Sequence, residues 1–403
     1  MLEVRNILVE ELYNENKKRL ETLRNGLTKD EDWLLCLGAG VSQSCGMPSW
    51  SDLLSRMLAR TLAFYPAQNE KNKVIKGIGS FVESGPDTRY LEKLEDACQG
   101  KYSDIMDGMD SLEAAEYVKE IIEMHMDNED ESMDSYKGDL KAQKRNQYIE
   151  KLIFESCRIE GLPEKSDREH GGTLKAVTHL MKSKIKTALT YNYDDLLEKG
   201  LTQYEGIEEK YVKSVIPGEK IEHLSGDERK IFHIHGSIPI IGSEKPKGKI
   251  VLTETSYYEE ERNGYSLANV LQSYAMTHYN LLYVGFSGAD YSFRRILRGL
   301  GKMDNKIKRY IFFCLDDILK SIVITCCREK VKEKKEKKIT NSKKAWKFVL
   351  EDIVNDKEGE YNFEKVLINH IIWAKTRYWA DHGLTVIWST LEELPGHLYG
   401  LVD

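Results

Sequence analysis

The sequence lacks several features that would place it in a particular class of protein. No stretch of its 403 residues comes near the ~18 consecutive apolar residues that a membrane-spanning helix needs. The N-terminal segment 1–26 alternates charged with aliphatic residues at helical spacing and has no apolar core of the kind that a secretory signal carries. These absences favour a cytoplasmic protein that makes no contact with a membrane.

Paired cysteines and an excess of positive charge are missing as well. The seven cysteines are scattered and none forms a CxxC pair, so we expect free thiols and no metal. Lys and Arg number 59 against 66 Asp and Glu, which leaves no global positive field to attract nucleic acid. The lysine-rich run 328–344 is interpreted as a solvated helix or linker, and the acidic stretch 127–131 as a solvated loop.

Short apolar runs that end in small or polar residues recur along the chain and predict strands. Segments of helical periodicity, such as 196–203 and 266–278, lie between several of them. This alternation predicts an α/β fold with a Rossmann-like parallel sheet flanked by helices. The predicted strands are 33–37, 185–190, 231–235, 250–253, 281–286, 309–315 and 384–388.

The same patterns predict how the chain is divided. A helix over 1–30 precedes one α/β domain over 31–315, and C-terminal helices with a closing strand fill 316–403. Between about 71 and 170 the sequence is charged and helical in pattern, without the β-branched runs of core strands. We interpret this stretch as a helical insertion inside the α/β domain.

A glycine-rich turn follows the first predicted strand. In Gly38-Ala39-Gly40, with Ser42 just beyond, small residues allow backbone amides to approach a diphosphate at the start of a helix. The same glycines also fit a purely structural tight turn. Gln43 stands where the third glycine of GxGxxG belongs, and no acidic residue ends a second strand ~20 residues on. These departures disfavour a hydride-transferring dehydrogenase.

A polar segment follows the predicted strand 185–190. Thr190, Asn192 and Asp194 come at the carboxyl end of that strand, where open α/β sheets bind their ligands. Asn192 or Asp194 would alternatively cap the helix that starts near Leu196. Capping and catalysis do not exclude each other.

Two histidines end the predicted strand 231–235. Alternation along a strand points His233 and His235 the same way, and His235, directly before Gly236, is the better candidate for contact with a ligand and for proton transfer. A metal held by both histidines is the weaker alternative, since no third ligand stands at a diagnostic spacing.

Small polar residues also follow the predicted strand 281–286. Gly285 and Ser287 are suited to cradle a ribose or an adenine against the backbone. Asp290 is interpreted either as part of this segment or as the cap of a helix that begins near Tyr291.

Taken in order, GAGVS, TYNYD, HIHG and VGFS, with the first extended to GAGVSxxxGMPSW, resemble the sirtuin-like domain of bacterial antiphage proteins over about 33–315. Deacetylating sirtuins carry a four-cysteine zinc module, and this chain has no CxxC pair. Asn192 and Asp194 match the family's Asn-x-Asp. Tyr193 between them replaces an aliphatic residue, which is typical of the NAD-hydrolysing branch.

The resemblance implies an enzyme that uses NAD as its substrate, cleaves it to nicotinamide and ADP-ribose, and depletes NAD during phage infection. It implies that Asn192 and His235 carry out the chemistry. Because cleavage of the glycosidic bond needs a placed water and a base, we expect Asn192 to orient the water and the ribose hydroxyls, His235 to accept a proton, and Asp194 to position nicotinamide or stabilise positive charge. The residues carried over to NAD binding are Gly38, Ala39, Gly40 and Ser42 at the diphosphate, Thr190, and Gly285 and Ser287 on the adenosine side.

The resemblance also implies partners. A compact chain of this kind resembles the sirtuin-domain subunit that assembles with a HerA-type hexameric ATPase, so we expect a homo-oligomer controlled by such an ATPase. Two alternatives remain open: a metal-dependent nuclease with His233, His235 and Asp194 as ligands, and a non-catalytic sensor of NAD or ADP-ribose.

Overall fold

One seven-stranded sheet forms the centre of the molecule. The computed structural model describes residues 3–28, 32–63, 110–127, 138–157, 159, 161–167, 170–220, 224–240, 247–299, 307–326, 349–350, 353 and 363–402. The strand order is β3-β4-β2-β1-β5-β6-β7, and every neighbouring pair is parallel. The strands are β1 (Trp33–Leu37), β2 (Thr187–Thr190), β3 (Val212–Val215), β4 (Arg229–His233), β5 (Asn280–Val284), β6 (Arg309–Cys314) and β7 (Thr385–Ser389).

Each face of the sheet carries its own hydrophobic core. Side chains alternate along β1, so Leu35 and Leu37 belong to one buried cluster while Leu34 and Cys36 belong to the other. All five residues of β1 are buried, as expected for the central strand of a parallel sheet that is covered on both faces.

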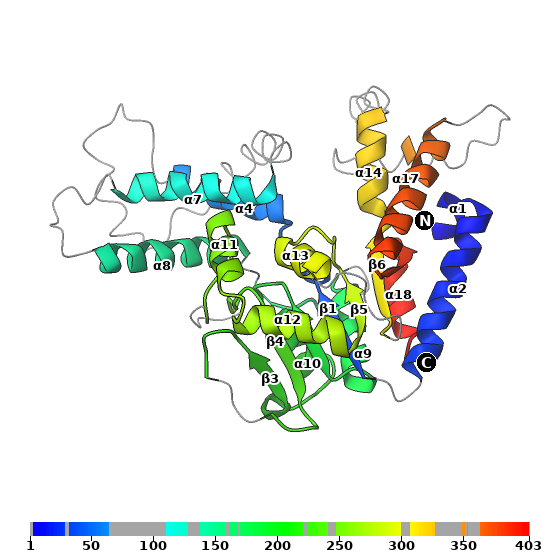
Figure 1. The fold of residues 1–403 in the computed structure, drawn as a ribbon, viewed down its shortest axis with the longest axis horizontal. Helices are drawn as coiled ribbons and strands as arrows, with labels where there is room; N and C mark the ends of the chain where they lie inside the picture. The colour runs from blue at the N-terminus through cyan, green and yellow to red at the C-terminus, as the bar shows by residue number, and fades with distance from the viewer. Residues whose placement is uncertain are drawn as a thin grey trace.

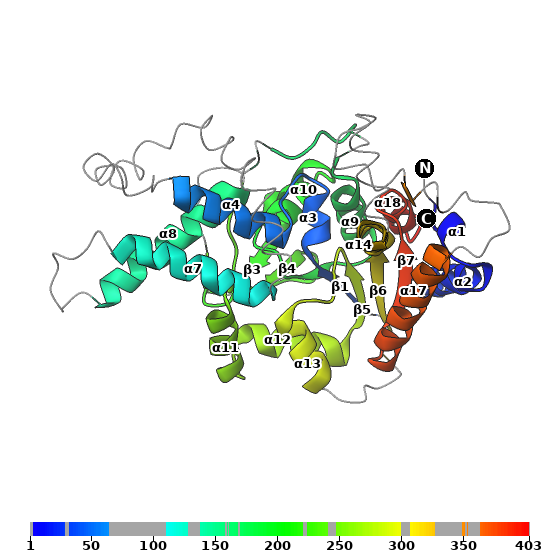
Figure 2. The ribbon, with the colours of Figure 1, turned by 90° about the horizontal axis from the view of Figure 1, so that it is seen from above.

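Helices cover both faces of the sheet, as Figure 2 shows from above. On one side lie α3 (Ala39–Gln43), α9 (Gly172–Ser183), α10 (Leu196–Gln203) and α18 (Leu394–Tyr399). On the other side lie α12 (Leu267–His278), α13 (Tyr291–Gly299) and α17 (Phe363–Asp381). The remaining described elements are α1 (Val4–Ile7), α2 (Glu10–Leu27), the 3-10 helix η1 (Glu209–Tyr211), α11 (Glu254–Arg262) and α14 (Leu315–Cys326).

Three helices, α4 (Trp50–Ala63), α7 (Ser111–Asp127) and α8 (Gly138–Cys157), pack together and project from one end of the sheet (Figure 1). Their apolar side chains, among them Met57, Ile122 and Leu152, join the same cluster as Leu35 and Leu37 of β1. The helices α7 and α8 are the described helices of the predicted insertion 71–170. The lysine-rich run 328–344 lies outside the described residues, as does the acidic stretch 127–131 beyond Asp127.

At the opposite end of the molecule, α2 lies against the edge strand β7 (Figure 1). The buried side chain of Asn16 donates to the carbonyl oxygen of Trp388 at 2.9 Å and accepts from its amide at 2.7 Å. One asparagine therefore satisfies both backbone groups of an edge-strand residue, which protects that edge from pairing with another chain.

The α/β architecture predicted from the sequence is confirmed. Six of the predicted strands correspond to β1, β2, β4, β5, β6 and β7, with ends that differ by a few residues. The predicted strand 250–253 is wrong, because this segment leads into α11 and Thr253 is the N-cap of that helix, its side chain accepting from the amide of Ser256. The edge strand β3 was not predicted.

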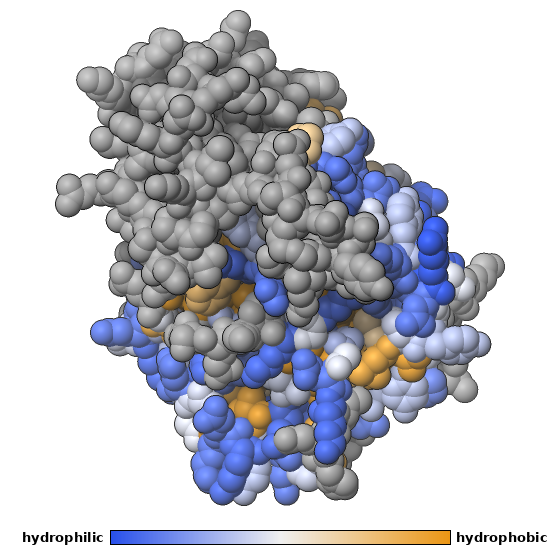
Figure 3. Space-filling model, turned by 90° about the vertical axis from the view of Figure 1, so that its left-hand side faces the viewer, coloured by the Kyte–Doolittle hydropathy of each residue, from blue (hydrophilic) through white to orange (hydrophobic). Residues whose placement is uncertain are grey.

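On the face shown in Figure 3, the described residues are mostly hydrophilic and the apolar side chains form small groups. Among the helices of the described ranges, none has the length and apolarity required to span a membrane.

Candidate functional site

The segments singled out in the sequence lie at the carboxyl ends of β1, β2, β4 and β5. From β1 the chain continues into α3, on one face of the sheet, and from β5 it continues into α13, on the other (Figure 2). The neighbours β1 and β5 therefore form the topological switch point of the sheet, where α/β proteins bind ligands in the crevice outside the strand ends.

The glycine turn after β1 packs directly on the turn after β5. The amide of Gly38 donates to the carbonyl of Val284 at 3.1 Å, and the amide of Gly40 donates to that of Gly285 at 2.9 Å. A Cβ atom on Gly40 would lie 2.9 Å from the Cα of Gly285, and Gly285 itself has a positive φ of 63°. Glycine is therefore required here for the close approach of two loops, and two of the loop amides are bonded within the protein.

Asn192 ties the end of β2 to the loop after β1. Its side-chain nitrogen Nδ2 donates to the carbonyl of Gly38 at 3.0 Å and to Ser42 Oγ at 2.9 Å. A carbonyl oxygen only accepts, so the amide must present its NH2 group to this loop, and the carbonyl oxygen Oδ1 faces elsewhere. The backbone amide of Asn192 donates to Thr190 Oγ1 at 3.1 Å. Asn192, Thr190 and Ser42 are all buried.

Asp194 is buried two residues further on. Its Oδ1 accepts from the amide of Leu196, the first residue of α10, at 3.2 Å, although the N-cap position of that helix belongs to Asp195, which makes no side-chain capping bond. Burial raises the pKa of this carboxyl to about 6, against the opposing effect of hydrogen bonds from Ser42 and from the amide of Leu196. A carboxyl with such a pKa exchanges its proton close to neutral pH.

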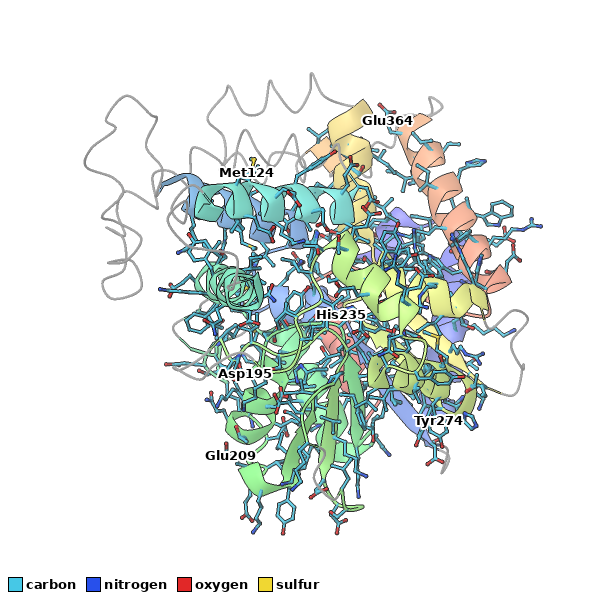
Figure 4. The ribbon with its side chains drawn as sticks, turned by 60° about the vertical axis from the view of Figure 1, so that its left-hand side comes forward. Met124, Asp195, Glu209, His235, Tyr274 and Glu364 are labelled. Carbon is cyan, nitrogen blue, oxygen red and sulfur yellow. The ribbon has the colours of Figure 1, made fainter. Side chains whose placement is uncertain are left out.

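His235 is buried and forms a hydrogen-bonded network with two other side chains, the buried Tyr257 and the half-buried Asp290. Its Nε2 lies 2.9 Å from Asp290 Oδ2, and the hydroxyl of Tyr257 donates to the same oxygen at 3.0 Å. The Tyr257 hydroxyl is also 3.3 Å from Nε2. In Figure 4, His235 lies near the centre of the molecule at the upper ends of the strands.

Asp290 acts in two ways at once. Its Oδ1 accepts from the amide of Phe293 at 2.8 Å, which confirms the predicted capping of α13, while its Oδ2 faces His235. Burial favours the protonated form of this carboxyl, but the imidazole of His235 and the hydrogen bonds from Phe293 and Tyr257 outweigh burial and hold its pKa below the usual value. The carboxylate is therefore ionised at neutral pH.

His233 has a different partner. The strand β4 ends at His233, so the alternation that predicted a common direction for the two histidines does not extend to His235. His233 Nε2 lies 2.7 Å from Glu198 Oε1, on α10. Burial lowers the pKa of His233 and raises that of Glu198, but attraction between the two dominates, and the net shift is upward for His233 and downward for Glu198.

The contacts gather the predicted residues into two groups. Hydrogen bonds join Asn192 to Gly38 and Ser42, and a second set joins His235 to Asp290. Tyr191 lies between the groups: its amide donates to Leu37 at 3.0 Å, and its ring centre is 5.6 Å from that of His235. The other predicted positions are Ala39 and Ser287, which are exposed, and Gly40 and Gly285, which are half-buried.

Sequence reasoning missed Tyr257 and one contact of Asp290. Tyr257 stands in the helix α11, outside every strand-end motif, and nothing in its neighbourhood marked it. Asp290 was interpreted as a cap or as part of the VGFSGAD segment, and its contact with His235 was not predicted.

Among the described residues, neither a cluster of metal ligands nor either of two cavities includes these positions. In the described ranges, no three His, Cys, Asp or Glu side chains converge as metal ligands would. A cavity of about 300 Å³ lies between α7, α8 and the segment 249–259, and one of about 380 Å³ lies at the amino ends of β6 and β7. Neither of these two cavities is lined by Asn192 or His235.

The chain is similar to a known family over part of its length. Residues 186–341 match the SIR2-like domain, a segment that holds Asn192, Asp194, His235, Gly285 and Asp290 but not the glycine turn after β1. This match supports a sirtuin-like protein, and such domains are often NAD-dependent enzymes. Among curated proteins no match to the chain was found.

Proposed function

We propose that this chain, with its SIR2-like segment 186–341, is an NAD hydrolase that releases nicotinamide and ADP-ribose. The observation that carries the proposal is the position of Asn192 and His235 after the neighbouring parallel strands β2 and β4, beside the switch point of β1 and β5. A buried asparagine and a buried histidine at such a crevice suit the hydrolysis of a bound dinucleotide.

NAD would lie across the strand ends. Gly38, Ala39, Gly40 and Ser42 would line the diphosphate, Thr190 would line the site at the end of β2, and Gly285 and Ser287 would meet the adenosine side. Because the amides of Gly38 and Gly40 donate within the protein, hydrogen bonds to the diphosphate would come from other groups. The exposure of Ala39 and Ser287 agrees with contact to a ligand at both turns.

The reaction needs a placed water molecule and a base. The bond between the ribose C1′ and the nicotinamide nitrogen breaks, and its electron pair goes to that nitrogen, which neutralises the pyridinium. The water oxygen bonds to C1′ as oxocarbenium character develops, and its proton passes to His235. Asn192 would orient the water or a ribose hydroxyl through Oδ1, since its Nδ2 is bonded to Gly38 and Ser42.

Asp194 would support this chemistry by charge. In its ionised form it would stabilise the positive charge that develops on the ribose, or it would position the amide end of nicotinamide. Its raised pKa means that a fraction of the side chains is protonated near pH 6.

The biological setting belongs to the same proposal and is supported by the sequence resemblance. The protein would act in the cytoplasm, deplete NAD in antiphage defence, form a homo-oligomer, and be controlled by a HerA-type hexameric ATPase.

The experiment is NAD turnover by the purified full chain, alone and with the ATPase, with products separated by chromatography. We expect equal amounts of nicotinamide and ADP-ribose, and no turnover by the Asn192→Ala and His235→Ala variants. His233→Leu is the matched control, because it removes a buried histidine at the end of β4 and leaves the contacts of His235 with Asp290 and Tyr257 in place. Bound NAD without turnover in either condition would leave a nucleotide sensor, and chelator-sensitive cleavage of DNA would favour a nuclease.

A further inference from the structure

Two buried side chains, those of His235 and Tyr257, meet at one carboxylate oxygen of the half-buried Asp290. His235 follows β4, Tyr257 belongs to α11, and Asp290 precedes α13. The distances to Asp290 Oδ2 are 2.9 Å from His235 Nε2 and 3.0 Å from the Tyr257 hydroxyl. The exposed fractions of the His235 and Asp290 side chains are 4% and 13%. Such a network restrains the imidazole far more than a single solvated hydrogen bond would.

We infer that Asp290 and Tyr257 are positioning residues for His235, which hold its imidazole with the proton on Nε2 and leave Nδ1 as the atom that accepts a proton. The inference rests on the proposed function for its effect on turnover, but the state of the ring can be measured without NAD.

The tautomer follows from the chemistry of the partner. An ionised carboxylate has acceptors but no donor, and the lowered pKa of Asp290 keeps it ionised at neutral pH. The ring nitrogen that faces it must therefore carry a hydrogen, so in the neutral imidazole the second nitrogen is unprotonated. The Tyr257 hydroxyl has one proton, and it donates that proton to Asp290.

The groups around the imidazole of His235 differ in charge. Tyr191 and Tyr257 lie against the ring, with ring centres 5.6 and 5.1 Å away, and Tyr193 interacts electrostatically with both Tyr257 and Asp290. Burial raises the pKa of all three tyrosines well above the usual value, so they stay neutral. The negative charge that faces His235 in this network comes from Asp290.

The chain contains a matched control for this network. His233, the last residue of β4, is buried, and its Nε2 lies 2.7 Å from the half-buried carboxylate of Glu198. Glu198→Gln removes a half-buried carboxylate charge beside a histidine, as Asp290→Asn does, but acts on the other ring. Any general effect of losing such a charge will appear in both variants.

Asp290→Asn keeps the shape of the side chain and removes its charge. The new side chain keeps the Oδ1 acceptor for the amide of Phe293, while its NH2 group would donate to Nε2 and force the ring proton onto Nδ1. Turnover at neutral pH should fall by at least about a hundredfold because the accepting nitrogen is then blocked. Tyr257→Phe should lower turnover by about two- to tenfold, because the carboxylate loses one hydrogen bond and keeps its charge.

The test is the tautomer of the His235 ring at neutral pH, measured from the NMR chemical shifts of its two ring nitrogens in the full chain without NAD, with the His235→Gln spectrum as the assignment, beside kcat/KM. In Asp290→Asn the ring hydrogen should move from Nε2 to Nδ1, together with the fall in turnover. Glu198→Gln should leave the tautomer of His235 unchanged. An unchanged His235 tautomer in Asp290→Asn, or the same change in Glu198→Gln, would overturn the inference. A changed tautomer in a protein that never consumes NAD would overturn the proposed function alone.

Discussion

The side-chain amide of Asn192 lies 2.9 Å from the hydroxyl of Ser42. The first of these residues follows β2 and the second lies in α3, after β1, so a residue of the proposed catalytic group also fixes the glycine turn beside it. Catalysis and loop structure therefore depend on the same side chain, and substitution experiments must separate the two.

The stabilities of the Ser42→Ala and Asn192→Ala variants measure how much these side chains contribute to the structure of the loop. We expect Ser42→Ala to lower the free energy of unfolding by about 1 kcal/mol, because Asn192 keeps its bond to Gly38 although the hydrogen bond from Ser42 to Asp194 is lost as well. Asn192→Ala should cost about 2 kcal/mol, since it leaves both the Gly38 carbonyl and the Ser42 hydroxyl without this partner. Urea unfolding followed by tryptophan fluorescence gives both values. Equal losses would show that the bond of Asn192 to Gly38 contributes no more than the bond of Ser42 to Asp194.

Gly285→Ala tests the close approach of the two turns. Its Cβ would lie 2.5 Å from the amide nitrogen of Val41 at a φ of +63°, so backbone strain and steric overlap add, and we expect a loss of about 3 kcal/mol. Gly46→Ala is the control, because Gly46 also has a positive φ but no atom within 4 Å of an added Cβ. This variant should lose about 1 kcal/mol, from backbone strain alone. Similar urea midpoints for the two variants would contradict the packing argument.

Asp194 should make stability depend on pH in a defined direction. Its folded pKa of about 6 lies above the unfolded value, so between about pH 4 and pH 6 the native state binds more protons than the unfolded state, and stability falls as pH rises. The whole effect is about 3 kcal/mol, from roughly two pKa units. Asp194→Asn cannot titrate, so its stability relative to the unmodified protein should improve by that amount from pH 4 to pH 7. A pH-independent difference in urea unfolding would contradict this.

His233 should be important for stability and not for turnover. His233→Leu leaves the half-buried carboxylate of Glu198 with the hydroxyl of Ser214 but without its histidine, and we expect a loss of about 2 kcal/mol, with turnover per folded molecule unchanged. The double variant His233→Leu/Glu198→Leu should recover much of the loss, because it removes the uncompensated charge. Unfolding curves and NAD assays at 20 °C test both statements. A variant of normal stability without turnover would instead place His233 in the reaction.

The central strands could be predicted from the sequence because burial on both faces demands continuous apolar runs, as in Trp33–Leu37. The edge strand β3 escaped prediction because only Val215 of its four residues is buried. The segment 250–253 has the same apolar character as a true strand, but the capping side chain of Thr253 commits it to the start of α11.

Only the site residues that follow strands could be predicted from the sequence. Asn192, Asp194 and His235 follow strands, so the parallel sheet brings them to one edge whatever the intervening chain does. Tyr257 reaches the network from a helix, and its contact with Asp290 depends on how α11 packs, which no local pattern encodes. The bond of Asn192 to Ser42 likewise depends on the pairing of β1 with β2.

The position of β1 in the sheet has a consequence for how the chain can be divided. The segment 186–341, which matches the SIR2-like domain, contains β2 to β6, yet β1 pairs with both β2 and β5. A fragment cut at those limits would have two unpaired apolar edges where its middle strand belongs, and we expect it to aggregate. During synthesis β1 leaves the ribosome long before β2 and β5, and it stays unpaired until they follow. The limits of sequence similarity are therefore not the limits of a folding unit.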